Sequence, residues 1–127
     1  MINIGVIGYG YWGPNLARNF SETEGAVLAA VADLDKKKLE SVARRYPAVR
    51  TTTYFQDLLE DPSIDAIAIA TPVSSHFELG MAALKARKHV WLEKPMAETS
   101  LQARKLLDEA ERRERILIVD HTFIYTA

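Results

Sequence analysis

Three glycines near the N-terminus have the spacing of a phosphate-binding loop. An apolar run over residues 2–8 leads into Gly8, Gly10 and Gly13, arranged as Gly-x-Gly-x-x-Gly. In such a loop the first glycine permits a tight turn off the strand, and the second lets a pyrophosphate approach the backbone. The third lets the next helix pack close to the strand. Pro14 suits the first helical position, where unpaired N–H groups would face the phosphates. The spacing predicts a dinucleotide site, and the alternative is a glycine turn without a ligand.

A carboxylate stands where such a site would bind the adenosine ribose. Asp33 closes a second apolar run, residues 26–33, and lies twenty positions after Gly13. An acid there accepts hydrogen bonds from the ribose hydroxyls and repels a 2′-phosphate, so it favours NAD over NADP. The alternative role, capping the next helix, suits Asp35 better and leaves Asp33 free for the ribose. The three lysines at 36–38 read as a solvated helix face, although one of them pairing with a phosphate would weaken the preference for NAD.

Lys94 is the candidate catalytic residue. Hydride transfer from an alcohol carbon requires removal of the hydroxyl proton, and an ammonium beside that hydroxyl stabilises the developing alkoxide and can relay the proton. Pro95 restricts the backbone after it and is a candidate for a cis peptide bond. The alternative is a surface lysine in a strand-to-helix loop, with Glu93 as its ion-pair partner. His76, at the start of a predicted helix, is expected to contact the cofactor rather than to act as an acid or base.

Strand and helix patterns alternate along the chain and must position these residues. Apolar runs predict strands over about 2–8, 27–33, 50–53, 66–71, 89–93 and 116–119. Helical spacing predicts helices over about 14–21, 36–46 and 74–87, a brief helix with Phe55, Leu58 and Leu59, and a helix that begins behind Thr99. Gln102 completes a capping box in this last helix, which is expected to bury Leu101, Leu106, Leu107 and Ala110. The pattern predicts a doubly wound α/β sheet, a Rossmann fold, with six strands in the order 3-2-1-4-5-6.

Polar side chains follow the carboxyl ends of these predicted strands. Besides the glycine loop and Asp33, they are Thr71, Pro72, Ser74, Ser75 and His76 after the fourth strand, Glu93, Lys94 and Pro95 after the fifth, and Asp120 and His121 after the sixth. Ligands of open parallel sheets bind beyond this edge, near the point between the first and fourth strands. We therefore expect these side chains to converge on one site.

Composition narrows the class of protein. The 127 residues suit one domain, 48% of them are hydrophobic, and the net charge of −1 does not indicate a nucleic-acid or membrane surface as the main partner. No apolar run approaches the length of a membrane span, and the N-terminus enters a strand without a signal segment. The lack of cysteine fits a reducing cytoplasm. We expect a cytoplasmic protein without a metal site.

The motifs together resemble a known oxidoreductase family. The segments are Gly8 to Phe20, Ala70-Thr71-Pro72, His76, Glu93-Lys94-Pro95 and Asp120 to Phe123, and in this order they are similar to the N-terminal half of the Gfo/Idh/MocA oxidoreductases. That group takes its name from glucose–fructose oxidoreductase and inositol dehydrogenase. The loop around Tyr11 and Trp12 looks most like the branch that oxidises nucleotide-linked sugars, such as UDP-N-acetylglucosaminuronate 3-dehydrogenases.

This resemblance implies roles for single residues. By it, Lys94 meets the substrate hydroxyl and the nicotinamide ribose, Glu93 holds that ribose, Thr71, Pro72 and His76 line the cofactor, and Tyr11 and Trp12 offer backbone N–H groups to the pyrophosphate. Val73 departs from the family pattern, because many relatives carry a polar residue such as Asn there.

The resemblance also implies a second α/β domain that supplies most substrate contacts, a further acid–base residue and usually the oligomer interface. On this reading, residues 1–119 are the dinucleotide-binding domain and residues 120–127 are the truncated start of the next one. The fragment is then expected to bind NAD but to turn over little, whereas the full-length protein would be a homo-oligomer acting on a sugar or nucleotide sugar. Phe123, Ile124 and Tyr125 would lack their packing partners.

Two other hypotheses remain at this point. One is a non-catalytic NAD(P)-binding sensor or scaffold of the same fold, since fold alone does not establish chemistry. Retention of Glu93-Lys94-Pro95 argues against it. The other is a methyltransferase that uses S-adenosylmethionine, which also has a glycine-rich first loop. The glycine spacing into a helix begun by Pro14, together with six strands, favours the dinucleotide.

Overall fold

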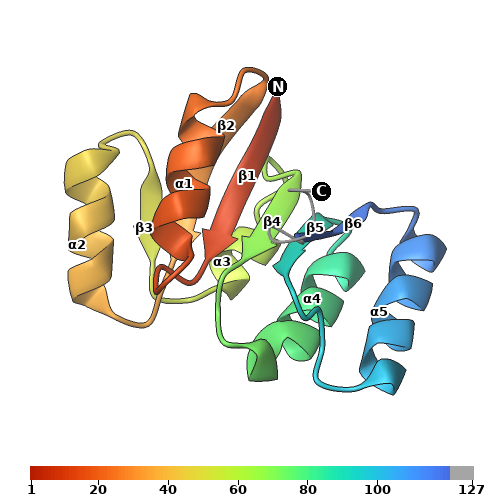
Figure 1. Ribbon diagram of the computed structural model, residues 1–127. Coiled ribbons are helices and arrows are strands. Elements are labelled where there is room, and N and C mark those ends of the chain that lie inside the picture. The colour runs from red at the N-terminus through yellow and green to blue at the C-terminus, as the bar shows by residue number, and fades with distance from the viewer. Residues whose placement is uncertain (121–127) are drawn as a thin grey trace, which may run out of the picture.

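The chain folds into one parallel sheet with helices on both faces (Figure 1). The computed structural model describes residues 1–120. Its elements are β1 (Ile2–Ile7), α1 (Gly13–Glu22), β2 (Ala26–Ala32), α2 (Lys36–Arg45), β3 (Arg50–Thr52), α3 (Gln56–Leu59), β4 (Ala66–Ile69), the 3-10 turn η1 (Val73–Ser75), α4 (His76–Lys85), β5 (His89–Glu93), α5 (Ser100–Arg113) and β6 (Leu117–Asp120). The strand order is β3-β2-β1-β4-β5-β6 with every neighbouring pair parallel. The predicted doubly wound sheet and its order are confirmed.

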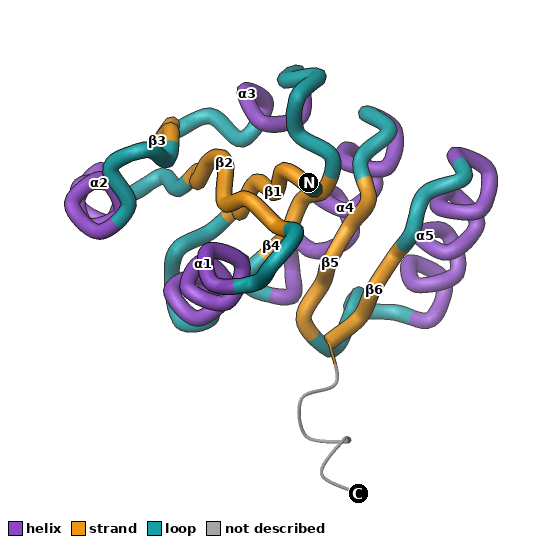
Figure 2. Tube along the Cα trace, turned by 90° about the horizontal axis from the view of Figure 1, so that it is seen from above, coloured by secondary structure: helices purple, strands orange, loops and turns teal. Residues whose placement is uncertain are grey.

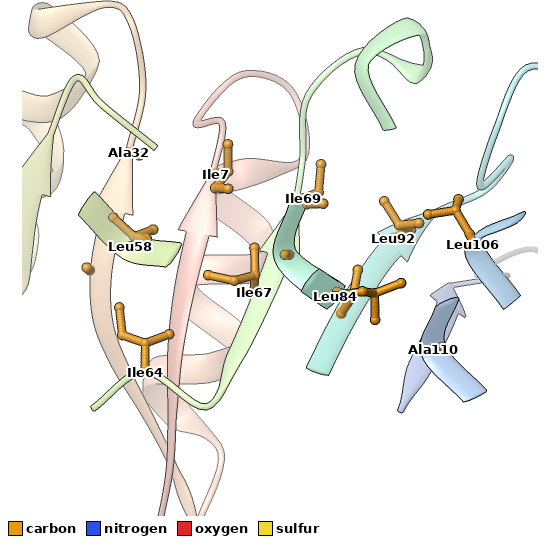
Figure 3. Close-up of a cluster of buried hydrophobic side chains, with 13 residues drawn as sticks. Ile7, Ala32, Leu58, Ile64, Ile67, Ile69, Leu84, Leu92, Leu106 and Ala110 are labelled. Carbon is orange, nitrogen blue, oxygen red and sulfur yellow. The ribbon is translucent and has the colours of Figure 1, made fainter. Parts of the chain in front are cut away.

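Two layers of helices sandwich the sheet. Seen along the layers, α1 and α2 lie on one face, and α3, α4 and α5 lie on the other (Figure 2). Successive strand residues point to opposite faces, so Val6 packs with Leu16 of α1, whereas Ile7 belongs to the core beneath α3 to α5. Figure 3 shows this second core, where Leu58, Leu84 and Leu106 reach the sheet from three helices.

The central strand β4 explains why the sheet must be covered on both sides. Ile67, Ala68 and Ile69 have no solvent exposure, although they point alternately to the two faces. A strand that is apolar on both faces is stable only between two helix layers. The prediction of a doubly covered parallel strand is therefore confirmed.

The last helix buries a narrower face than the sequence predicts. Leu106 and Ala110 are buried, but Leu101 is 64% exposed and Leu107 is 47% exposed. In a helix each residue turns by about 100°, so Leu107 and Leu101 stand about 100° and about 140° away from Leu106. Because α5 covers the sheet with one stripe, both leucines fall outside it and the expectation that they are buried is wrong. Half of the predicted capping box is present, since Thr99 Oγ1 accepts a hydrogen bond from the Gln102 N–H at 3.1 Å. The Gln102 side chain accepts from the Glu98 N–H at 3.2 Å, rather than from the Thr99 N–H that a capping box uses.

The remaining differences concern the ends of elements. The helix predicted over 74–87 is divided into η1 and the shorter α4. No helix within residues 1–120 has the length and apolar character needed to cross a membrane. The expectations for His121, Phe123, Ile124 and Tyr125 lie outside the described residues.

Candidate functional site

A cavity of about 750 Å³ lies at the carboxyl-terminal edge of the sheet, the edge toward which the β1 arrow points in Figure 1. Most of its wall is formed by residues that follow four strands: Gly8, Gly10, Tyr11 and Trp12 after β1, Asp33, Leu34 and Lys38 after β2, Thr53 and Phe55 after β3, and Thr71, Pro72 and Ser75 after β4. Ile7, Ala32, Ala70 and, from α4, Glu78 and Leu79 complete it. The cavity therefore lies between β1 and β4, which are neighbours in the sheet. The helices that follow these two strands, α1 and α4, lie on opposite faces of the sheet, so this position is the topological switch point.

The glycine loop has the geometry that its spacing predicts. Gly8 has a φ of +96°, and a Cβ there would lie 2.9 Å from the carbonyl carbon of Ala70. A Cβ on Gly13 would collide with the carbonyl oxygen of Gly8, so α1 packs directly against the strand end. At Gly10 the nearest atom to an added Cβ is Lys38 Nζ, 4.0 Å away, so this position opens toward the cavity.

The two helices that begin near the cavity, α1 and α4, lack the side-chain cap that α2 and α5 have. Asp35 caps α2 by accepting from the Lys37 N–H, and Thr99 caps α5. By contrast, α1 and α4 have no side-chain cap, and Pro14 occupies the first turn of α1. Uncapped helix amides carry partial positive charge and bind anions. The start of α1, beside the wall residue Trp12, is therefore suited to a phosphate.

Asp33 is part of the cavity wall, and its carboxylate is held by two backbone amides. Asp33 Oδ2 accepts from the Tyr9 N–H at 2.6 Å, and Oδ1 accepts from the Asp35 N–H at 2.8 Å. The role of Asp35 as a helix cap is confirmed, but Asp33 is not free of backbone contacts. Each carboxylate oxygen still has a further lone pair, so a ribose hydroxyl can donate to Asp33 in this position.

Tyr9, between Gly8 and Gly10, anchors the glycine loop in the hydrophobic core. The Tyr9 side chain is buried among the apolar residues beneath α1 and α2. Burial raises the pKa of the Tyr9 hydroxyl, and the neighbouring Tyr46 raises it further. Tyr9 thus remains a neutral core residue, while its N–H is bound by Asp33.

Several wall residues were not predicted from the sequence. Thr53 and Phe55 follow β3, and Leu34, which is 89% exposed, follows Asp33. Lys38 is exposed, as expected of a solvated helix face, and its ammonium lies beside Gly10, where the alternative of a phosphate contact for one of the three lysines stays open. The signal for Thr53 and Phe55 is their place just after the carboxyl end of a predicted strand, at the edge where ligands bind. The position of Lys38 depends on how α2 packs, and no motif marks it.

The loop after β4 is held by its own hydroxyl groups. Ser75 Oγ donates to Thr71 Oγ1 at 2.6 Å and lies 2.8 Å from the carbonyl oxygen of Pro72. The predicted site residues Thr71 and Pro72 are in the cavity wall. These bonds give the loop a defined shape next to Gly8.

His76 is placed differently from the expectation of a cofactor-lining residue. It is 2% exposed and, among the residues that the structure describes, lies outside the wall of the cavity. Its Nδ1 is 3.0 Å from the carbonyl oxygen of Pro95, and its Nε2 is 2.9 Å from that of Thr71. The imidazole thus joins the loop after β4 to the loop after β5.

Glu93, Lys94 and Pro95 stand at the end of β5, on the same edge of the sheet as the cavity. Glu93 is buried, whereas Lys94 and Pro95 are exposed, and the Lys94–Pro95 bond is cis, as the sequence suggested. Within the described part of the chain, Glu93 and Lys94 lie beyond the cavity wall. Since β5 pairs with β4, Lys94 stands one strand away from Thr71 along the same edge.

An aromatic pair stands at the rim. Tyr11 is 86% exposed and meets Trp12 edge to face, with 4.9 Å between ring centroids. Both residues belong to the cavity wall. Within residues 1–120, no group of three histidine or acidic side chains is placed to hold a metal ion.

The comparison with known families decides which class of protein carries this site. A family model described as an oxidoreductase family with an NAD-binding Rossmann fold matches residues 2–121. The chain belongs to the Gfo/Idh/MocA family. This assignment favours a nicotinamide dinucleotide at the Gfo/Idh/MocA glycine loop, and the alternative of S-adenosylmethionine loses its support.

Relatives of this Gfo/Idh/MocA chain include sugar-type dehydrogenases. The uncharacterized oxidoreductase YdgJ of Escherichia coli is 39% identical over 121 residues, which are 94% of this chain and 34% of that protein. The scyllo-inositol 2-dehydrogenase (NADP(+)) IolW of Bacillus subtilis is 30% identical over 125 residues, 94% of this chain and 33% of that protein. Other inositol dehydrogenases match as well. The chain spans about a third of the length of these curated relatives.

A solved structure supports the same assignment. GenD2 from gentamicin A biosynthesis, crystallised in complex with NAD, has a TM-score of 0.93 and 27% identity to this chain, covering 98% of it and 35% of GenD2. The similar proteins thus include one whose name gives NADP as the cofactor and one whose structure contains NAD. The similarity therefore does not distinguish between the two cofactors.

Proposed function

We propose that this chain is the cofactor-binding part of an oxidoreductase that moves hydride between a nicotinamide dinucleotide and a hydroxyl-bearing carbon of a sugar or cyclic polyol. One observation carries the proposal: Gly10, the uncapped start of α1 and the Asp33 carboxylate meet in one cavity of about 750 Å³. Family membership and the inositol dehydrogenases among the relatives support it.

The residues present fit a dinucleotide from end to end. The backbone of Tyr11 and Trp12 and the free amides of α1 would hold the pyrophosphate, because Gly10 leaves that side open. Asp33, fixed by two amides, would accept from the adenosine ribose hydroxyls. Apolar contacts from the rim residue Leu34 suit the adenine ring. The fixed positions of these groups lower the cost of ordering the ligand.

The other end of the cofactor would lie toward the loops after β4 and β5. Thr71 and Pro72 would line it, and Glu93 would hold the nicotinamide ribose. The bound nicotinamide supplies the hydride chemistry. Lys94 would bind the reacting hydroxyl through its ammonium, stabilise the alkoxide charge that develops there and relay the proton. The exposure of Lys94 leaves its Nζ accessible to a substrate.

The choice between NAD and NADP rests on two opposed charges. The Asp33 carboxylate repels a 2′-phosphate, whereas the Lys38 ammonium, beside Gly10 in the same wall, attracts one. We propose NAD as the preferred cofactor, because both oxygens of Asp33 are fixed by backbone amides while Lys38 is an exposed, flexible side chain.

The substrate class is proposed from the relatives and the rim. Within sugars and polyols, a nucleotide-linked sugar is the finer proposal, based on the Tyr11-Trp12 loop. Exposed aromatic rings such as Tyr11 provide a flat apolar surface suited to the C–H face of a sugar ring. A cytoplasmic location and a homo-oligomeric state remain predictions.

Calorimetric titration of the 127-residue chain with NAD, NADP and S-adenosylmethionine tests the binding half of the proposal. We expect NAD to bind more tightly than NADP and S-adenosylmethionine not to bind. A folded chain that binds neither dinucleotide would refute the proposed function.

The catalytic half is tested in a longer protein that contains this domain, with a panel of inositols, sugars and nucleotide sugars and NADH absorbance as readout. Lys94→Ala should abolish turnover with little change in cofactor affinity, and Lys85→Ala, an exposed lysine at the end of α4, serves as control. Turnover that survives Lys94→Ala unchanged would instead favour a non-catalytic role for this site.

A further inference from the structure

We propose that His76 is a positioning residue that staples the Lys94–Pro95 loop to the Thr71–Pro72 loop and thereby sets where the nicotinamide end of the site stands. The inference rests on the proposed function where it names the nicotinamide end of the site. The contacts of His76 with the two loops do not depend on that function. His76 starts α4 and is buried, and it does not belong to the cavity wall that the structure describes. Both nitrogens instead face carbonyl oxygens of two different loops.

The chemistry of the two contacts makes this staple specific for histidine. A carbonyl oxygen only accepts, so each contact requires a proton on the ring nitrogen involved. The tautomer with a proton on Nδ1 donates to the Pro95 carbonyl over 3.0 Å, and the tautomer with a proton on Nε2 donates to the Thr71 carbonyl over 2.9 Å. A ring with a single proton holds only one of the two loops at a time. Among common side chains, no other presents two donors on opposite sides of a small rigid ring.

The loop at Pro95 depends more on its contact with His76 than the loop at Thr71 does. The Thr71 side has further support, because Ser75 bonds both Thr71 and Pro72. On the Pro95 side, the contact with His76 joins the carbonyl of the residue directly after Lys94 to the sheet edge. Removing the Nδ1 donor should therefore free the Lys94 loop while leaving the Thr71 loop in place.

Two conservative substitutions separate the two contacts. The amide nitrogen of Asn takes the place of Nδ1, and that of Gln takes the place of Nε2. His76→Asn should keep the bond to Pro95 and lose that to Thr71, whereas His76→Gln should do the reverse. The two variants are matched controls for each other, because both remove the imidazole and keep one amide donor.

The probes are NADH and ADP, titrated into the 127-residue chain and both variants. ADP lacks the nicotinamide half, so the ratio of the two affinities reports on that end of the site. We expect ADP affinity to stay within about twofold in both variants. The NADH-to-ADP ratio should fall about tenfold in His76→Gln and stay near the original in His76→Asn, the size expected for one lost hydrogen bond.

Hydrogen exchange provides a readout that needs no ligand. Amide exchange over residues 94–98 should rise in His76→Gln and not in His76→Asn, with residues 71–75 protected in both. Equal losses of NADH and ADP in the two variants, or an unchanged ratio and exchange in His76→Gln, would overturn the inference. If the original chain binds neither ligand, the proposed function fails, and the exchange pattern alone supports or refutes the staple.

Discussion

The Asp33 carboxylate accepts a hydrogen bond from the backbone N–H of Tyr9 over 2.6 Å, so the end of β2 holds the glycine loop that follows β1. A residue selected from the sequence as a ribose ligand is thus also a structural support for the pyrophosphate loop. Substitutions at Asp33 must therefore separate a change in ligand contacts from a change in loop shape.

Asp33→Asn removes the charge and keeps one of the two contacts with the backbone amides of Tyr9 and Asp35. The amide retains an oxygen that can accept from one backbone amide, but it removes the negative charge beside the ribose. We expect NAD affinity to fall about tenfold and NADP affinity to fall less, because repulsion of the 2′-phosphate disappears. Asp35→Asn, outside the cavity wall, is the control and should leave the NAD-to-NADP ratio as it is, as measured by calorimetry. Equal losses for both cofactors in Asp33→Asn would confine Asp33 to the structural role.

Substitution by alanine should lower stability at Gly13 and lower NAD affinity at Gly10. A Cβ on Gly13 meets the backbone of Gly8, so Gly13→Ala should lower the free energy of unfolding by about 1–3 kcal/mol in urea titrations. Gly10→Ala places its methyl group in open space and should leave stability within about 0.5 kcal/mol. It should nevertheless weaken NAD about tenfold or more, because the methyl group occupies the side from which the pyrophosphate approaches. Full NAD affinity in Gly10→Ala would contradict the proposed orientation of the ligand.

Lys38 should affect NADP more than NAD. Its ammonium is in the cavity wall, whereas the neighbouring Lys37 is not. We expect Lys38→Met to weaken NADP about fivefold at low salt, as suits a single exposed ion pair, and Lys37→Met to change little. The difference should shrink in high salt, because counterions screen exposed charges. Equal effects on NAD and NADP would assign Lys38 to the shared pyrophosphate instead.

Asp61 should make stability sensitive to acid. Hydrogen bonds from the Ser63 side chain and amide, joined by the Arg50 guanidinium, lower the pKa of Asp61 from 3.8 to about 2. A carboxyl whose pKa is lower in the folded state stabilises the fold above its unfolded value and loses that contribution as pH falls through the folded value. The difference in melting temperature between the original chain and Asp61→Asn should therefore be constant above about pH 4 and vanish toward about pH 2. A difference that persists unchanged at pH 2 would contradict the assignment.

Local signals predicted the parts of this protein that depend on neighbours in sequence. The glycine loop, the Asp35 and Thr99 caps and the doubly buried strand β4 are all encoded within a few residues, since turns, caps and apolar alternation are short-range properties. The strand order was expected from the dinucleotide-binding topology that the glycine loop indicates, together with right-handed crossovers.

Predictions failed or were missing where the answer depends on packing between distant segments. Leu101 and Leu107 look like core leucines, but α5 presents only one stripe to the sheet. Thr53 and Lys38 join the cavity because β3 and α2 pack beside β2, which no local pattern states.

By itself, the sequence determined the class of fold, the phosphate loop and the acid that follows it, because each is written in residue types at short, fixed spacings. Only the tertiary structure decided that Asp33 supports the loop, that Lys38 reaches the cavity and that His76 bridges Thr71 and Pro95. These relationships join residues from different strands, and the distances between them are set by how the helices and strands pack rather than by the number of residues between them.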